Sequence, residues 1–307
     1  MLPSRVRIRE VGPRDGFQNE PEVIPTDDKV ALIELLAASG LRRIELTSFV
    51  RADVVPQLAD AAEVLHRVRL PEGVAGTVLI PNQRGLDAAL AHRGSFSEVN
   101  VFLSASETHN RRNVNRSVTE SLRGLRSVLG RARAEELHCE GVISTSFGCP
   151  YEGEVPVKRV LGIAAELVEA GAQEIGFGDT TGMANPVAVG AFFAAAREEL
   201  DDAVELTAHF HNTRGQALAN VLAALQAGVA SYESSFGEFG GCPVPRGATG
   251  NVATEDLVSM LSEMGIETGV ALDDILEAAR AARGLLGRPL GSHVLTAGPV
   301  RWTPETA

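Results

Sequence analysis

Two histidines, His209 and His211, stand two positions apart in the segment TAHFHN, within a stretch rich in apolar and β-forming residues. Side chains alternate between the two faces of a strand, so residues two apart share one face. Such a pair can be two core histidines, each satisfied by a backbone carbonyl. It can also be two imidazole ligands of one divalent cation. The rest of the chain has to decide between these interpretations.

Polar side chains also close other segments that have the composition of buried strands. They are Arg14, Asp15, Gln18 and Asn19 in VGPRDGFQNE, Glu45, Thr47 and Ser48 in IELTSF, Asp179 in GDTTG, and the polar segments SASETHNRRN and GEFGGCPVPRGATGN. Charged and imidazole groups inside strands are costly unless they are paired or bound to a metal. One such residue fits a structural ion pair, but five strands that end in this way favour an active site.

A His-x-His pair facing an Asp from another strand suits a divalent cation, because imidazole and oxygen ligands bind Mg²⁺, Mn²⁺, Co²⁺ or Zn²⁺. A structural zinc site would more readily recruit thiolates, and no cysteine stands beside the two histidines. We therefore expect an open octahedral site in which water or substrate completes the coordination.

One recurring pattern predicts the elements that position these residues. A stretch with helical periodicity ends in a small residue and a glycine, and a strand-like segment follows, at 32–49, 86–106, 164–179 and 221–236. The glycines, which stand where a helix needs a left-handed C-terminal residue, are Gly40, Gly94, Gly171 and Gly228. Alternating helices and strands with short links predict parallel strands joined by right-handed crossovers.

Eight strands are expected, at about 5–11, 42–48, 74–80, 98–104, 139–146, 173–178, 204–211 and 230–236. Eight such units predict an α/β fold, a TIM (β/α)8 barrel with a short C-terminal helical extension. A doubly wound open sheet is the alternative, which the lack of GxGxxG after the first strand weakens. We expect one catalytic domain over residues 1–307, with the barrel at about 5–260 and helices and a tail at 261–307.

The composition argues against several classes of function. The net charge is −12 over 307 residues and no basic cluster stands out, so nucleic-acid binding is not expected. No apolar run approaches the ~18 residues of a membrane span, and MLPSRVRIRE lacks the apolar core of a secretory signal. The three cysteines, Cys139, Cys149 and Cys242, have no CxxC spacing, which indicates a reduced, cytoplasmic protein.

Two cysteines stand in Gly-Cys-Pro settings. Cys242 lies in FGEFGGCPVPRGATGN, whose five glycines predict a mobile lid that brings this thiol over the mouth of the barrel. Cys149 lies in FGCPYEG, which lacks flanking glycines, so we expect Cys149 to be structural.

Seven motifs in order resemble the 3-hydroxy-3-methylglutaryl-CoA lyase family, which belongs to the metal-dependent TIM-barrel lyases and Claisen-type synthases. They are EVGPRDGFQNE, IELTSFV, SASETHNRRN, GCPYEG, GDTTGMANP, HFHNTRGQALAN and GGCPVPRGATGNVATEDLV. The resemblance covers about residues 5–290, and the related synthases lack the Gly-Gly-Cys-Pro loop. It implies a retro-Claisen cleavage of 3-hydroxy-3-methylglutaryl-CoA to acetyl-CoA and acetoacetate.

The same resemblance implies roles for individual residues. The ligands of a divalent metal, Mg²⁺ or Mn²⁺, would be Asp15, His209, His211 and Asn251. Arg14 would stabilise the enolate, Glu45 and Asp179 would orient the site or move protons, and Cys242 would return a proton to the enolate carbon. Asp179 and His209 compete as the general base. We expect contacts to the acyl-CoA substrate from Gln18, Asn19 and Ser48. The protein is expected to be a homodimer or higher homo-oligomer. Nucleic-acid and membrane partners are not expected.

Several positions depart from the common family pattern. Asn212 follows the second histidine where relatives carry Asp, the lid contains Glu238, Phe239 and Val244, and Pro21 replaces a Lys that could contact a phosphate of CoA. These changes leave open a lyase for a longer 3-hydroxy-3-alkylglutaryl-CoA. An alkylmalate-type condensing synthase is also considered, but such enzymes usually extend further beyond the barrel. A non-enzymic metal-binding or scaffold protein is disfavoured because the catalytic positions are filled.

Overall fold

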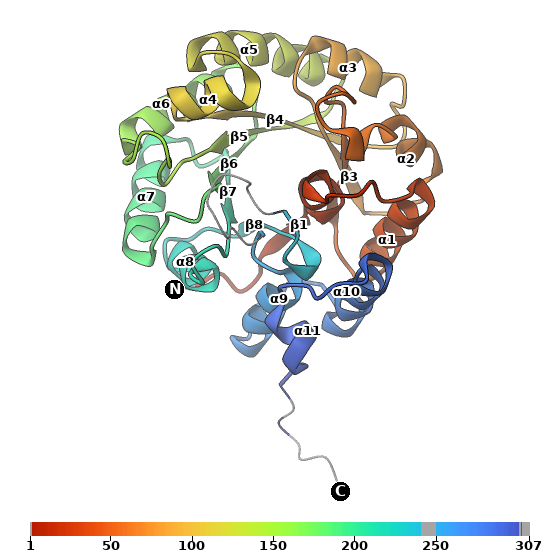
Figure 1. Ribbon diagram of the computed structural model, residues 1–307. Helices are drawn as coiled ribbons and strands as arrows, with labels where there is room; N and C mark the ends of the chain where they lie inside the picture. The colour runs from red at the N-terminus through yellow and green to blue at the C-terminus, as the bar shows by residue number, and fades with distance from the viewer. Residues whose placement is uncertain (1, 241–249, 301, 303–307) are drawn as a thin grey trace, which may run out of the picture.

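The computed structural model describes residues 2–240, 250–300 and 302. Eight parallel strands form a closed barrel in chain order, and β8 pairs with β1 (Figure 1). The strands are β1 (Arg7–Glu10), β2 (Arg43–Ser48), β3 (Ala75–Leu79), β4 (Glu98–Ser104), β5 (His138–Ser144), β6 (Glu174–Asp179), β7 (Glu205–Phe210) and β8 (Ser231–Ser234). The predicted TIM barrel is confirmed, and the pairing of β8 with β1 excludes the open sheet.

The strands agree with the predicted ranges to within about two residues at each end. The difference that matters is at β7, which ends at Phe210, so that His211 lies just past the strand. An isolated antiparallel bridge to Asn251 holds His211 there. The backbone after β7 and the segment that precedes α9 are therefore fixed to each other.

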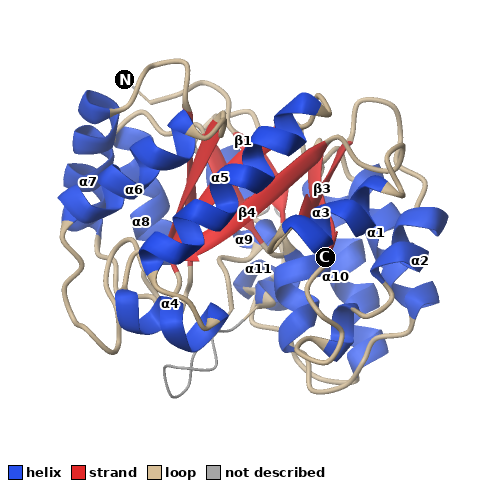
Figure 2. Cartoon of the chain, turned by 90° about the horizontal axis from the view of Figure 1, so that it is seen from above, coloured by secondary structure: helices blue, strands red, loops and turns tan. Residues whose placement is uncertain are grey.

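Helices surround the barrel, as the view in Figure 2 shows. They are α1 (Thr26–Ala38), α2 (Ala61–Arg67), α3 (Gln83–Leu90), α4 (Glu107–Val114), α5 (Val118–Ala134), α6 (Val157–Glu169), α7 (Pro186–Glu199), α8 (Ala217–Gln226), α9 (Thr254–Glu263), α10 (Leu272–Leu286) and α11 (His293–Ala297). Helix α10 packs against α1 and completes the ring (Figure 1). Among the described residues, none of the helices is both long and apolar enough to cross a lipid bilayer.

Three of the four glycines that were expected to end helices adopt the left-handed conformation. Gly40, Gly171 and Gly228 have φ values of 95°, 113° and 89°. At Gly40 a side chain is also excluded by space, because a Cβ there would lie 2.2 Å from the carbonyl oxygen of Gly269. The expectation for Gly94 is wrong: α3 ends four residues earlier and its chain turns through hydrogen bonds to His92, so no left-handed residue is needed there.

The interior of the barrel contains a buried network of ion pairs that the sequence reading did not anticipate. Arg9 on β1 contacts Glu140 on β5, a strand on the opposite side of the ring, so both side chains point inward. Arg9 also donates to Glu174 at 3.0 Å, and Arg43 donates to Glu174 at 2.5 Å and to Glu98 at 3.0 Å. Removing one partner of such a buried pair typically costs ~3–5 kcal/mol. The network therefore ties β1, β2, β4, β5 and β6 together beneath the polar strand ends.

Candidate active site

The turn after β1 brings Arg14 and Asp15 over the barrel. In this turn, the helical segment η1 (Gly12–Gly16), the amides of Arg14 and Asp15 both donate to the carbonyl of Val11. The buried carboxylate of Glu10 accepts from the Gly12 amide at 2.7 Å. A Cβ at Gly12 would lie 2.6 Å from the Phe236 ring, so only glycine fits this approach of the β1 and β8 loops. The loop sequence thus fixes the direction of both functional side chains.

Three predicted ligands, Asp15, His209 and His211, meet at the C-terminal end of the barrel. Each offers a donor atom, and these atoms lie within 4.8 Å of one another. The Nε2 atoms of the two histidines face each other at 3.1 Å. Two nitrogens bound to one ion at ~2.0–2.1 Å and at right angles would be about 3 Å apart. The spacing of the two imidazoles therefore fits a shared cation.

Asn251 completes this group. Its Nδ2 donates to Asp15 Oδ2 at 2.7 Å and to the carbonyl of Phe239 at 3.0 Å. Its Oδ1 is buried and, within the described part of the chain, has no hydrogen-bond partner. A carboxylate, two imidazoles and an amide are a suitable donor set for a divalent cation, and an unsatisfied buried oxygen beside them agrees with one.

The electrostatics of the group favour ligands that are ready to bind. Burial alone would raise the pKa of Asp15, but the Arg14 guanidinium and the two imidazoles outweigh it and lower that pKa. Burial and the neighbouring His209 lower the pKa of His211 to about 3. At neutral pH Asp15 is therefore ionised and His211 neutral, which are the states that coordinate a metal.

His209 differs from His211 in having a carboxylate behind it. Its Nδ1 lies 2.8 Å from Oε2 of Glu233, the residue in register with it on β8. Burial lowers the pKa of His209, but the hydrogen bond to Glu233 and the charge of this carboxylate raise it overall. The sequence reading missed Glu233, although a charged residue inside the apolar strand SYES was a signal that could have drawn attention to it.

Arg14 is oriented by two carboxylates. Its Nε donates to Glu45 Oε2 at 2.6 Å and its Nη1 to Asp15 Oδ1 at 2.9 Å. The other oxygen of Glu45 accepts from Asn100 Nδ2 at 2.5 Å, so Asn100 on β4, a residue not predicted for the site, positions Glu45. Burial opposes the charge on Arg14, yet its acidic neighbours raise the pKa further, and the guanidinium is a fixed cation.

Asp179 ends β6, next to β7, and lies outside the group of three candidate metal ligands. Its Oδ1 accepts from the amides of Met183 and Ala184 at 2.7 and 3.0 Å. Its Oδ2 is buried and has no partner in the described chain. Burial raises the pKa of Asp179 to about 7, so this carboxyl can gain or lose a proton near neutral pH.

The three residues expected to contact substrate have different surroundings. Gln18 donates to Asp15 Oδ1 at 2.8 Å, and Asn19 donates to the Asp15 carbonyl at 3.0 Å. Both side chains therefore hold Asp15 in place. Ser48 is buried at the end of β2, where its hydroxyl accepts from the Val50 amide at 3.4 Å.

The two Gly-Cys-Pro cysteines have different outcomes. Cys242 lies outside the described residues. Cys149 is fully buried and its Sγ lies 3.0 Å from Ser106 Oγ, which agrees with a structural role.

Two of the departures from the family pattern contact each other, because Asn212 Nδ2 donates to Glu238 Oε2 at 3.3 Å.

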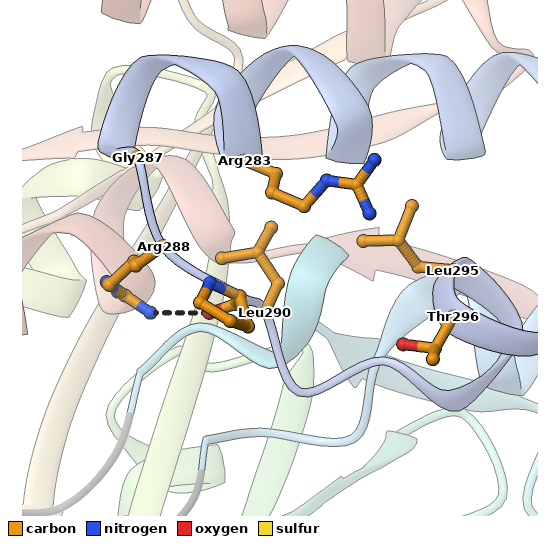
Figure 3. Close-up of a pocket in the computed structure, with 7 residues that line it drawn as sticks. Arg283, Gly287, Arg288, Leu290, Leu295 and Thr296 are labelled. Carbon is orange, nitrogen blue, oxygen red and sulfur yellow. Dashed lines mark hydrogen bonds between the residues drawn. The ribbon is translucent and has the colours of Figure 1, made fainter.

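A separate cavity of about 440 Å³ lies between the end of α10 and α11 (Figure 3). It is lined by Arg283, Gly287, Arg288, Pro289, Leu290, Leu295 and Thr296. Arg288 also donates to the carboxylate of Glu20 at 2.5 and 2.7 Å, and its guanidinium lies 5.6 Å from the centre of the Phe239 ring. The cavity is thus connected to the loops that follow β1 and β8.

Known proteins are similar in sequence to this chain over nearly its whole length. The chain is 46% identical over 293 residues to hydroxymethylglutaryl-CoA lyase YngG of Bacillus subtilis, covering 95% of this chain and 97% of the relative. It is 45% identical to the mitochondrial hydroxymethylglutaryl-CoA lyase of Rattus norvegicus, covering 96% and 90%.

Solved structures agree. The crystal structure of the Bacillus subtilis HMG-CoA lyase matches with a TM-score of 0.93 and 45% identity over 96% of this chain and 98% of that one. An HMG-CoA lyase from Acinetobacter baumannii, in complex with coenzyme A and 3-methylmalate, matches with a TM-score of 0.93 and 36% identity over 99% and 98%. The HMGL-like family matches residues 5–281, and the chain belongs to this family.

Proposed function

We propose that the protein is a divalent-metal-dependent carbon–carbon lyase that cleaves 3-hydroxy-3-methylglutaryl-CoA to acetyl-CoA and acetoacetate. The observation that carries this proposal is the meeting of Asp15, His209 and His211 beside the fixed cation Arg14. Relatives named as hydroxymethylglutaryl-CoA lyases, at 45–46% identity over nearly the whole chain, support the same reaction. One catalytic domain over residues 1–307 stays a prediction from the sequence.

Asp15, His209, His211 and Asn251 would hold the metal, with Mg²⁺ or Mn²⁺ as the expected ion. When bound, the cation would supply Lewis-acid polarisation of the substrate's oxygen atoms. Gln18, Asn19 and Arg14 keep Asp15 in place for this task through hydrogen bonds of 2.8, 3.0 and 2.9 Å.

Arg14 stabilises the charge that develops during the cleavage. The proton leaves the C3 hydroxyl, the C2–C3 bond breaks, C3 becomes the ketone of acetoacetate, and the electron pair moves into the thioester enolate of acetyl-CoA. A guanidinium already oriented by Glu45 needs no reorganisation when this enolate charge appears. Protonation of the enolate carbon then gives acetyl-CoA.

Asp179 is our choice for the base that takes the hydroxyl proton. Both ring nitrogens of its competitor are already engaged, since His209 Nδ1 faces Glu233 and its Nε2 faces His211. Asp179 instead has a buried oxygen without a partner in the described chain, and burial raises its pKa to about 7, which suits proton transfer near neutral pH. Cys242 is proposed to return a proton to the enolate, a role that rests on the sequence motif alone.

An acyl-CoA substrate is supported by the related structure with coenzyme A bound. We propose that part of the CoA moiety occupies the cavity lined by Arg283 and Arg288, whose positive charges suit phosphates. Ser48 stays a candidate contact of the acyl group. A homodimer or higher homo-oligomer and a cytoplasmic location stay predictions from the sequence.

Product analysis tests the function. Metal-free protein is mixed with 3-hydroxy-3-methylglutaryl-CoA with and without Mg²⁺ or Mn²⁺, and acetyl-CoA and acetoacetate are quantified. Analogues with longer 3-alkyl groups are run in parallel, because Glu238 and Phe239 alter the lid. Formation of both products in equal amounts, dependent on metal, is expected. Cleavage of the longer analogues alone would change the substrate, and condensation of acetyl-CoA with a keto acid without any cleavage would refute the lyase.

A further inference from the structure

A row of three side chains connects the metal site to the ion pairs inside the barrel. Arg9 on β1, Glu233 on β8 and His209 on β7 are register neighbours on adjacent strands. Residues in register on neighbouring strands have side chains on the same face, and here that face is the barrel interior. The proposed reaction assigns no role to Arg9 or Glu233.

Glu233 divides its two oxygens between its neighbours. Oε2 lies 2.8 Å from His209 Nδ1, and Oε1 accepts from Arg9 Nη1 at 3.0 Å. Arg9 in turn contacts Glu140 and donates to Glu174 at 3.0 Å. Arg9 and Glu233 are almost fully buried, with side-chain exposures of 1% and 3%. The carboxylate of Glu233 is therefore fixed from both sides.

We propose that Glu233, held by Arg9, is the positioning residue of the metal site. Its carboxylate requires a donor at His209 Nδ1, and this fixes the proton of the neutral ring on Nδ1. The lone pair of Nε2 is then presented to the site formed with His211 and Asp15. A carboxylate behind a metal-binding histidine sets both its tautomer and its orientation. The inference rests on the metal site of the proposed function.

The two histidines are consequently not equivalent. Within the described residues, Nδ1 of His211 is buried without a hydrogen-bond partner. Its Nε2 faces His209 Nε2 at 3.1 Å, so in metal-free protein the position of its proton follows from the tautomer of His209. His211 is instead fixed through its backbone bridge to Asn251. The tautomer of the pair is thus determined at His209.

Glu233→Gln is a sharp test because it keeps the shape and changes the number of acceptors. A carboxylate offers one oxygen to Arg9 and one to His209, whereas an amide has a single oxygen. Arg9 is always a donor, so the amide oxygen should turn toward Arg9 and the amide NH₂ toward His209. Nδ1 must then accept, and the ring proton moves to Nε2, the atom that the metal needs.

Glu140→Gln provides the matched control. Glu140 contacts the same Arg9 guanidinium but has no contact with His209 among the described residues. Two measurements are made on each protein. The dissociation constant of Mn²⁺ is measured by electron paramagnetic resonance of the free ion. The histidine tautomers are read in metal-free protein from long-range ¹H–¹⁵N NMR correlations at alkaline pH, where the His209 ring is neutral.

Glu233→Gln should weaken Mn²⁺ binding by ~10–100-fold. It should also move the proton of His209 from Nδ1 to Nε2, as read from the assigned His209 resonances, whereas Glu140→Gln should change neither property. Wild-type affinity in Glu233→Gln, or an equal loss in Glu140→Gln, would overturn the proposal. If Glu233→Gln does not fold, Glu233→Asp is measured instead; it should bind Mn²⁺ several-fold more weakly and keep the Nδ1–H tautomer, and unchanged binding would count against the proposal. Because neither readout involves turnover, a protein that binds Mn²⁺ in this way but does not cleave the C2–C3 bond of 3-hydroxy-3-methylglutaryl-CoA would refute the proposed function alone.

Discussion

Replacing Arg14 with methionine tests whether a fixed cation stabilises charge that appears only in the transition state. The guanidinium is oriented before substrate binds, by Glu45 at 2.6 Å and Asp15 at 2.9 Å. These bonds use two of its five N–H groups, which leaves donors for the thioester oxygen. Loss of one such electrostatic donor typically lowers kcat by ~10²–10³. Arg14→Met should therefore reduce kcat by this factor and change KM far less.

The same substitution has a cost in stability that must be separated from the effect on catalysis. Glu45 is fully buried, and without Arg14 its carboxylate keeps Asn100 as its partner in the described chain. Breaking a buried ion pair costs ~3–5 kcal/mol. This is an upper bound here, because burial already raises the pKa of Glu45 and the carboxyl can take up a proton and lose its charge. Glu45→Gln combined with Arg14→Met removes the unpaired charge.

Urea unfolding and steady-state release of acetyl-CoA measure the two effects on the single and double variants. The double variant should regain much of the free energy of unfolding, because Asn100 still finds an acceptor, while kcat stays low. An Arg14→Met enzyme that changes only in KM would make Arg14 a binding residue. Recovery of kcat together with stability in the double variant would also refute the reasoning.

Three other outcomes are expected. Cys242→Ser should fold and bind metal but turn over ~10²-fold more slowly, which is the usual scale for a lost acid–base group. Full activity in a product assay would contradict the role of Cys242 as proton donor. Burial raises the pKa of Glu255 to about 8 and that of Glu10 to about 7, so the stability that these protonated carboxyls contribute is present below about pH 4.5 and is lost as the pH rises to 8. Glu255→Gln should flatten this decline by on the order of 3 kcal/mol in urea unfolding between pH 5 and 8 with a chelator present, and an unchanged slope would contradict it. Asn212→Asp would place a second carboxylate near Glu238 Oε2, which now accepts from Asn212 Nδ2 at 3.3 Å. It should lower the free energy of unfolding by ~1–2 kcal/mol, and adding Glu238→Gln should restore it. Additive effects of the two changes would exclude the coupling.

Hydrophobic periodicity was sufficient to predict the barrel, because each helix–Gly–strand unit is local in sequence. The His209–His211 spacing could be read for the same reason, because residues two apart in an extended segment share a face. The bridge to Asn251 holds His211 just past the end of β7. Asp15 and Asn251 could be joined to the two histidines only through the family motifs. Their meeting depends on the bridge from His211 to Asn251 and on the turn after β1, which no local pattern encodes.

The supporting residues could not be predicted from the sequence, because their roles depend on register across the barrel. Arg9 and Glu233 are each an isolated charge in a strand, and only the alignment of β1 with β8 brings them together. The bonds that Gln18 and Asn19 donate to Asp15 could not be predicted either, and their contact with substrate stays a prediction. Pattern identifies residues at the mouth of a barrel, but the direction of each side chain is set by its hydrogen-bond partners.

Titration of metal-free protein with Mn²⁺ tests the central claim most directly. The number of ions bound, the nitrogen couplings in pulsed electron paramagnetic resonance and the rate of acetoacetate formation are measured on the same samples. We expect one ion per chain, couplings to two imidazole nitrogens that fall to one in His211→Ala, and a rate that rises in proportion to occupancy. Cleavage at full rate without metal, or a bound ion that lacks imidazole couplings, would contradict a lyase site built on Asp15, His209 and His211.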